Sequence, residues 1–361
     1  MGQVGRGASG GGIGWNQVSH AYGPADQVPG WIAGLHDRGT AAQCLGELYG
    51  SIAHQGSRYS ATPLCVPLLV DVALDRSVVD RAGVVFLIGF CAMGYSGDWL
   101  DWRSQRRRQT APYERASWDA VVAEHRRLRE LLADLDRSVA AAALTVLAWT
   151  GDRSDRVLAA ITAAAESGDG RDQGTAWLSS VVLGQLPPGL PPPVSLAAPT
   201  GPGRFGAAVA ALVFGDASAP LEAVDELCSV FGSIDAGKDL TACEFLMPEV
   251  PERIAASALA DVPAHLRTHT STRLLTAISK GFVLGSAPLR AYLRLNLGEH
   301  RPPRTTAFLP AQVRQALTSL LEPLGNWRDA RTIGGRIYEL EERGLPATLD
   351  QLTQWLTPAG S

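Results

Sequence analysis

One short stretch of the chain gathers most of its chemically capable side chains. The segment His54–Ser60, HQGSRYS, lies between two apolar segments and brings together an imidazole, an amide, a guanidinium and a phenol. An imidazole titrates near neutral pH and can act as a general base, whereas a phenol can donate a proton or orient a ligand. A guanidinium binds carboxylates and phosphates through two parallel hydrogen bonds. This combination predicts a binding or catalytic site.

A second segment adds to this set. Residues 15–23, WNQVSHAYG, precede the first predicted helix and carry an imidazole and a phenol. Stacked helical hairpins place their turns side by side, so we expect the two segments to converge. The predicted ligand-binding residues are His20, Tyr22, His54, Gln55, Arg58 and Tyr59.

These residues support two interpretations. In the functional one, His54 is the general base, Tyr59 or Tyr22 is the acid or orienting donor, and Arg58 binds an anionic group. In the packing one, Arg58 forms an ion pair with Glu47, and His54 caps the carbonyl groups at the end of its own helix. The packing interpretation is favoured because irregular backbone needs internal hydrogen-bond partners.

The spacing of possible metal ligands predicts neither a metal nor a cofactor. His20, His36 and His54 do not share helical spacing with one another, and the pair His265 and His269 has no nearby acidic ligand. The sequence has no C-x-x-C pair and no G-x-S-x-G motif. The five cysteines lie in apolar runs and are expected to be buried, reduced thiols: Cys44, Cys65, Cys91, Cys228 and Cys243.

The composition is that of a folded protein. Of the 361 residues, 46% are hydrophobic and 19% are charged, which is enough apolar material for a continuous core and too little charge for disorder. The formal net charge of −4 argues against a surface devoted to nucleic acid. No signal peptide is recognisable, and no apolar run approaches the ~20 residues that span a bilayer. We expect a cytoplasmic protein without a membrane partner.

The hydrophobic pattern predicts an all-α protein. Apolar residues recur at helical intervals, and no run of alternating apolar and polar residues predicts a strand. Thr40 and Gln43 form a capping-box pattern at the start of one helix. Pro63 suits the first turn of the next helix, and Ser77 is expected to open a very apolar helix that ends near Met93.

Two short motifs recur along the chain. Val28-Pro29 and Val66-Pro67 are expected to occupy equivalent places in the first helices of successive hairpins. The sequence LDRSV occurs at residues 74–78 and again at residues 135–139, each time between apolar helical segments. Allowing for an insertion, the period is about 40 residues, which is typical of HEAT-type repeats. The fold class predicted is therefore a HEAT-like solenoid of stacked antiparallel helix pairs.

The predicted organisation has four parts. They are a flexible glycine-rich N-terminus (1–14), an N-terminal HEAT-repeat stack (15–185) with an insertion (94–112), a proline-rich linker (186–203) and a C-terminal helical stack (204–361). The insertion carries two tryptophans and an arginine run, which could contact nucleic acid or an acidic partner: Trp99, Trp102, Arg103, Arg106, Arg107 and Arg108. Acidic neighbours dilute this charge, so we favour a surface loop.

Several segments resemble a family of uncharacterised actinobacterial HEAT-repeat proteins. They are HAYG (20–23), LYGSIAHQGSRYSATPLCVPLL (48–69), LLADLDRSVAAAALTVLAWT (131–150), and the C-terminal LPAQVRQALTSLLEPLGNW with RGLPATLDQLTQWL (309–356). The resemblance covers most of the chain from Trp15 onward and is most specific at the HQGSRYSAT turn. It implies an all-α right-handed solenoid and assigns no activity.

The expected function is that of a binding scaffold whose concave groove receives a protein or peptide. One alternative is a cofactor-independent enzyme of bacterial secondary metabolism that acts on a small molecule at the turn shared by the first two repeats. A second alternative is a nucleic-acid-binding HEAT protein that uses the arginine-rich insertion.

Overall fold

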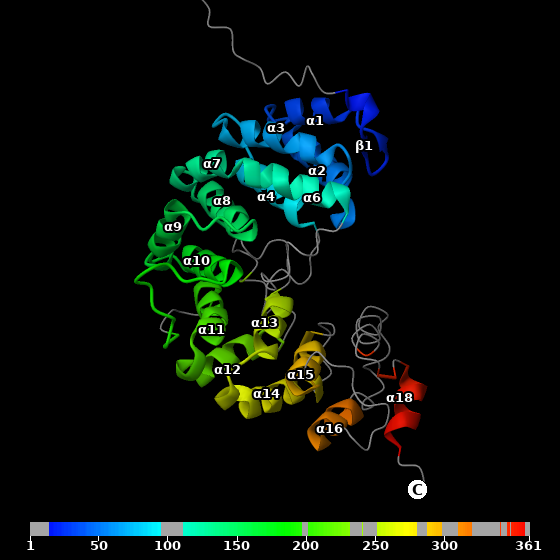
Figure 1. Ribbon diagram of the computed structural model, residues 1–361, viewed down its shortest axis with the longest axis vertical. Helices are drawn as coiled ribbons and strands as arrows, with labels where there is room; N and C mark the ends of the chain where they lie inside the picture. The colour runs from blue at the N-terminus through cyan, green and yellow to red at the C-terminus, as the bar shows by residue number, and fades with distance from the viewer. Residues whose placement is uncertain are drawn as a thin grey trace, which may run out of the picture. The chain divides into compact units, whose positions relative to one another are not determined.

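The computed structural model describes residues 14–94, 111–196, 201–231, 240, 251–279, 287–297, 310–319, 340, 345–346 and 348–357. The chain divides into two compact units (Figure 1). The first unit comprises Met1–Glu166 and Val182–Leu190, and the second comprises Ser167–Val181 and Pro191–Ser361. The described residues of both units are overwhelmingly helical, which confirms the all-α prediction.

The helices of the first unit form two layers. Its helices are α1 (Val28–Gly34), α2 (Ala41–Ile52), α3 (Thr62–Leu74), α4 (Arg81–Met93), α6 (Pro112–Ala123), α7 (His125–Leu128), η3 (Arg129–Ala133), α8 (Arg137–Trp149) and α9 (Asp155–Ala165). One layer runs from α1 through α3 to α6, and the other runs from α2 through α4 to α8. Helix α1 also packs on α2, α3 on α4, and η3 on α8. Successive helix pairs therefore stack in chain order (Figure 1).

Helix α4 is the centre of this unit. It packs against α2, α3, α6 and α8, and its residues are apolar on every side. Val84, Leu87, Ile88 and Cys91 are fully buried. A helix that is hydrophobic all round belongs in a core rather than at a surface, which accounts for its position.

One predicted helix start and one predicted helix cap are wrong. Helix α4 begins at Arg81 and not at Ser77, because the carboxylate of Asp80 caps it by accepting a hydrogen bond from the backbone N–H of Gly83 at 2.8 Å. The capping box predicted at Thr40 does not form, since its hydroxyl instead donates to the carbonyl oxygen of Gly34 at 3.0 Å. The start of α3 is as predicted, with Pro63 in its first turn.

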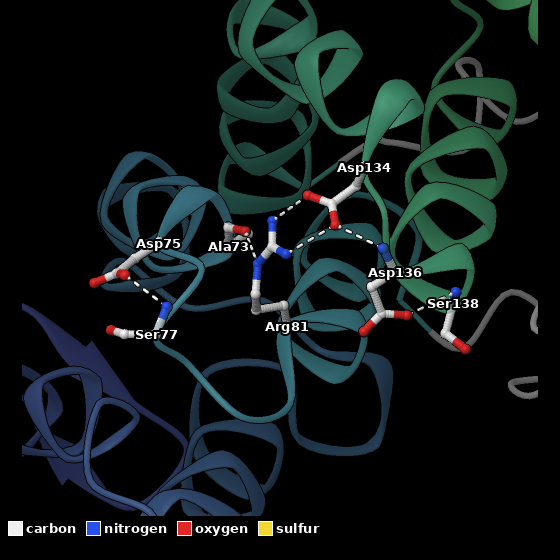
Figure 2. A network of polar contacts seen from close by, with 7 residues as sticks. All are labelled: Ala73, Asp75, Ser77, Arg81, Asp134, Asp136 and Ser138. Carbon is white, nitrogen blue, oxygen red and sulfur yellow. Dashed lines mark hydrogen bonds and ion pairs between the residues drawn. The ribbon is translucent and has the colours of Figure 1, made fainter.

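The two copies of the LDRSV motif form the same local hydrogen bond but lie at different positions relative to the neighbouring helices. Asp75 and Asp136 each accept a hydrogen bond from the backbone N–H two residues later, at 2.9 Å from Ser77 and 3.0 Å from Ser138 (Figure 2). Asp136 caps α8, whereas Asp75 lies at the end of α3, in the turn before α4. Identical sequence thus encodes the same turn at two different distances from the following helix.

Two further sequence expectations are corrected. Pro29 lies in the first turn of α1, whereas Pro67 lies inside α3, so the two Val-Pro pairs are not equivalent. Strands were not predicted, yet β1 (Ser19–His20) pairs antiparallel with β2 (Gly23–Pro24). Each strand has only two residues, which is too short for an alternating pattern to be recognised.

The described helices of the second unit also form layers. They are α10 (Gly170–Leu183, of which the residues up to Val181 belong here), α11 (Pro202–Phe214), α12 (Leu221–Ser229), α13 (Pro251–Ala260), α14 (Arg267–Ser279), α15 (Ala287–Leu297), α16 (Ala311–Ser319) and α18 (Leu349–Leu356). One layer runs through α11, α13 and α15, and the other through α12, α14 and α16.

Two details of the second unit bear on the sequence predictions. Helix α11 begins at Pro202 rather than at Arg204, because proline suits a first helical turn. The hydroxyl of Thr348 accepts a hydrogen bond from the N–H of Gln351 at 3.2 Å and so caps α18, as the Thr-x-x-Gln pattern of residues 348–351 predicts.

Candidate functional site

The segment Trp15–Ala25, here called the strap, lies on the turn between α2 and α3. The backbone N–H of Ser19 donates to Oγ of Ser60 at 2.8 Å, and the carbonyl oxygen of Ser19 accepts from the N–H of Ala61 at 3.1 Å. The N–H of Ala21 donates to the carbonyl oxygen of Ser51 at 3.0 Å. These bonds hold the predicted residues of the strap beside those of the turn.

Four aromatic rings form a row from α1 to this turn. The ring centroids are 5.7 Å apart for Trp31 and His20, 6.2 Å for His20 and Tyr22, and 5.3 Å for Tyr22 and His54. The hydroxyl of Tyr22 also lies 3.1 Å from Nδ1 of His54, within hydrogen-bond distance. The structure therefore brings together three of the predicted residues, His20, Tyr22 and His54.

The two histidines differ in their surroundings. His20 is buried, and its Nδ1 accepts a hydrogen bond from the backbone N–H of Tyr22 at 3.1 Å. Burial lowers the pKa of His20, which favours the neutral ring. His54 is only partly buried, and its neighbour Tyr22 is 70% exposed. The accessible chemistry therefore belongs to Tyr22 and His54.

The turn itself has an unusual backbone. Gln55 adopts φ 49° and ψ 33°, a left-handed conformation that non-glycine residues rarely take, and Gly56 follows with φ 78°. The side chain of Gln55 is exposed. These residues form the short 3-10 helix η2 (His54–Gly56), which leaves Gln55 exposed and His54 partly exposed.

Arg58 has a structural role, and its predicted partner is wrong. Its guanidinium donates to the carbonyl oxygen of Gly56 and lies 3.4 Å from a carboxylate oxygen of Glu114 on α6, rather than pairing with Glu47. Only 6% of its side chain is exposed, and burial lowers the pKa of Arg58 while Glu114 opposes that shift. A Cβ at Gly94 would overlap the guanidinium, so the end of α4 closes over it.

Tyr59 contributes mainly through its backbone. Its N–H donates to Oγ1 of Thr62 at 2.8 Å, and that hydroxyl donates to the carbonyl oxygen of Ile52 at 2.6 Å. These bonds join the end of α2 to the start of α3. The six predicted residues thus separate into an exposed group (Tyr22, His54 and Gln55), a buried ring (His20), and two residues that organise the turn (Arg58 and Tyr59).

A second polar cluster was missed by the sequence analysis. His125 lies with Nε2 2.8 Å from Oγ1 of Thr150, whose hydroxyl donates to the carbonyl oxygen of Val146, so the histidine N–H is the donor. Its Nδ1 is 3.7 Å from Asp152, which accepts from Nε of Arg129 at 2.6 Å. Burial lowers the pKa of His125, Asp152 raises it, and Arg129 lowers it. His125 and Arg129 lie in one segment and Thr150 and Asp152 in a later one, and no motif links the two segments.

The structure describes only some of the residues to which the remaining site predictions apply. Among the described residues, no group of three or more His, Cys, Asp or Glu side chains is placed to hold a metal. Cys65, Cys91 and Cys228 are buried free thiols, as predicted, whereas Cys44 is only partly buried. Burial raises the pKa of Cys91 and Cys228 to about 12. The glycine-rich N-terminus up to residue 13, the arginines of the insertion and Cys243 lie outside the described residues. Of the helices that the structure describes, none has the length and apolar character to cross a membrane.

Comparison with protein-family models, with curated proteins and with solved structures finds no match to this chain.

Proposed function

We propose that this chain is a HEAT-like helical-repeat scaffold that binds a protein or peptide partner. The observation that carries the proposal is the stacking of successive helix pairs in two layers, with an ion pair that joins one pair to the next. Stacks of this kind present extended surfaces to their partners. In the proposal, the partner lies along the concave side that a solenoid offers.

The ion pair between Arg81 and Asp134 supports the repeat interpretation. The two Nη atoms of Arg81 donate to the two carboxylate oxygens of Asp134 at 3.0 Å and 2.7 Å, and its Nε donates to the carbonyl oxygen of Ala73 at 2.8 Å (Figure 2). One side chain thus joins the end of α3, the start of α4 and the turn before α8. Nearer the N-terminus, Nδ1 of His36 lies 3.2 Å from a carboxylate oxygen of Asp75. This contact joins the turn between α1 and α2 to the turn between α3 and α4.

The placement of the predicted site residues favours a binding surface over an enclosed reaction centre. The side chain of Arg58 is only 6% exposed and lies beside Glu114, so the cation that would bind an anionic group is enclosed, whereas Tyr22 is 70% exposed. The exposed part of the predicted site is the side chain of Tyr22, which lies beside the hydrogen-bonding imidazole of His54. Interfaces are enriched in such amphipathic rings, which bury apolar area and also form hydrogen bonds.

A peptide-display selection tests this proposal. A library of random peptides is selected on the folded full-length chain, and the enriched sequences are measured in solution by fluorescence anisotropy. The proposal expects a shared sequence pattern whose binding slows hydrogen exchange in at least two consecutive helix pairs. A folded chain that enriches no peptide able to bind in solution would contradict it.

The hydrogen bond between Tyr22 and His54 favours a second candidate, a cofactor-independent enzyme acting on a small molecule. A phenol in contact with an imidazole can share a proton with it, as general acid–base catalysis requires. Hydrolysis of small activated esters is a direct test, with free imidazole as the reference. A rate above that reference that is lost in both His54→Gln and Tyr22→Phe supports the enzyme, and equal rates for all three chains exclude this chemistry.

A further inference from the structure

We infer that the turn between α2 and α3 is a binding site for a short β-hairpin, and that the strap occupies this site within the same molecule. The inference rests on the proposed function for the class of partner and goes beyond it in naming a site and its occupant. A partner peptide of matching sequence would then compete with the strap.

The hydrogen bonds of the strap are of the kind that an added peptide makes. Ser19 uses both its N–H and its carbonyl oxygen toward the turn, and Ala21, two residues later, uses its N–H. The strap is a β-hairpin, in which Ser19 lies in β1 and Ala21 begins the two-residue turn that joins β1 to β2. The receiving groups are Oγ of Ser60, the N–H of Ala61 and the carbonyl oxygen of Ser51. Main-chain bonds of this kind do not depend on which molecule supplies the chain.

Side chains give the site its selectivity. His20 is buried between Tyr22 and Trp31, and the hydroxyl of Ser19 lies 3.2 Å from that of Ser60. The hydroxyl of Tyr22 reaches His54 on the turn. The preferred occupant is therefore a hairpin-forming peptide with the pattern Ser-His-x-Tyr, in which the histidine is neutral and buried.

The strap is held weakly enough to be displaced. Its two strands have two residues each, and the bonds between Ser19 and Ser60 are solvent-exposed. Short hairpins of this kind are marginally stable on their own. The ring of Trp15 is buried, yet within the described part of the chain its Nε1 has no hydrogen-bond acceptor, which costs stability. The strap ends at Ala25, before α1 begins at Val28, so no α-helix includes a residue of the strap.

The test uses the full-length chain and a fluorescein-labelled peptide of residues 15–26. The variant Ser19→Pro/Tyr22→Ala opens the strap, because proline removes the N–H that bonds to Ser60 and alanine removes the contact with His54. Asn16→Ala, an exposed change in the strap, is the matched control. We expect the opened chain to bind the peptide at least about tenfold more tightly than wild type or the control, because the tethered strap competes at an effective concentration near the millimolar range.

Variants of the labelled peptide test whether the side chains of His20 and Tyr22 determine its binding. Peptides carrying His20→Ala or Tyr22→Ala should bind the opened chain at least about tenfold more weakly. Equal binding to wild-type and opened chains, or no binding to an opened chain that keeps its helical circular dichroism, would overturn the inference. Loss of that circular dichroism in the opened chain would also overturn it, since the strap would then be part of the core. If the display selection succeeds while this test fails, the scaffold proposal stands and only the strap site is lost.

Discussion

Arg81 and Asp134 form a bidentate ion pair between consecutive helix pairs, and only 7% of each side chain is exposed. Asp134 also accepts the N–H of Asp136 at 3.0 Å, and the hydrogen bond from Arg81 is the main cause that lowers the pKa of Asp134. Arg81 also donates a hydrogen bond to the carbonyl oxygen of Ala73 in the last turn of α3. The pair therefore fixes the distance between the end of α3 and the turn before α8.

Arg81→Met should lower the free energy of unfolding by about 3 kcal/mol, because it leaves the carboxylate of Asp134 buried without its partner. Arg127→Met is the matched control, since its pair with Asp71 is more exposed and should contribute no more than about 1 kcal/mol. Urea denaturation followed by circular dichroism measures both. Equal losses for the two variants would show that the buried pair has no special role.

Gly174→Ala should destabilise the second unit by about 1–3 kcal/mol. A Cβ at Gly174 would lie 2.7 Å from the carbonyl oxygen of Pro202, and the helices α10 and α11 cannot approach so closely with a larger residue. Gly46→Ala in α2 is the control, because a Cβ there meets nothing within 4 Å and alanine favours the helix by about 0.5–1 kcal/mol. The two variants should therefore shift the thermal midpoint in opposite directions. A stabilised Gly174→Ala chain would refute the close packing.

Gln55→Gly should stabilise the chain by up to about 1 kcal/mol, since glycine takes the left-handed conformation at φ 49° without steric cost. Gly56→Ala, at φ 78°, should have the opposite effect. Thermal unfolding of the two variants checks this pair of signs. A less stable Gln55→Gly chain would mean that the glutamine side chain makes a contribution larger than the backbone cost.

Stability should fall as the pH drops below about 6.5, the ordinary pKa of histidine. Burial lowers the pKa of His125 in the folded chain, so the unfolded chain binds a proton that the folded chain resists. The stabilisation is complete above the unfolded pKa and is lost as the pH falls toward the folded one. His125→Asn should flatten the profile of unfolding free energy between about pH 8 and pH 5. Some slope should remain because burial lowers the pKa of His20 in the same direction. An unchanged profile would exclude His125 as a cause.

The sequence predicted the helices better than their first residues. Apolar spacing located α2, α3 and α8, because burial of one face dominates helix formation. Helix starts depend on which side chain reaches a free N–H, and here Asp80 rather than Ser77 caps α4. Thr40 carries a favourable pattern, yet its hydroxyl bonds to Gly34. Such competition between nearby acceptors is not visible in a linear pattern.

The candidate site was predicted in part for a similar reason. His20, Tyr22 and His54 meet because the strap folds back onto the turn, although the strap is a β-hairpin before α1 and not the turn of a helical hairpin, as the prediction assumed. The partner of Arg58 is Glu114, which follows the insertion and shares no motif with the turn. The main-chain bonds of Ser19 could not be predicted either, because backbone groups carry no sequence signal. Side-chain types thus indicated where chemistry gathers but not which groups are exposed.

Hydrogen exchange on the intact wild-type chain tests the central claim, a displaceable strap on a stable helical stack, most directly. The three amides that bond strap to turn, those of Ser19, Ala21 and Ala61, should exchange together through a local opening. They should exchange at least about a hundredfold faster than the amides of buried α4, which open only with the whole unit. Strap amides protected as strongly as those of α4 would contradict the account.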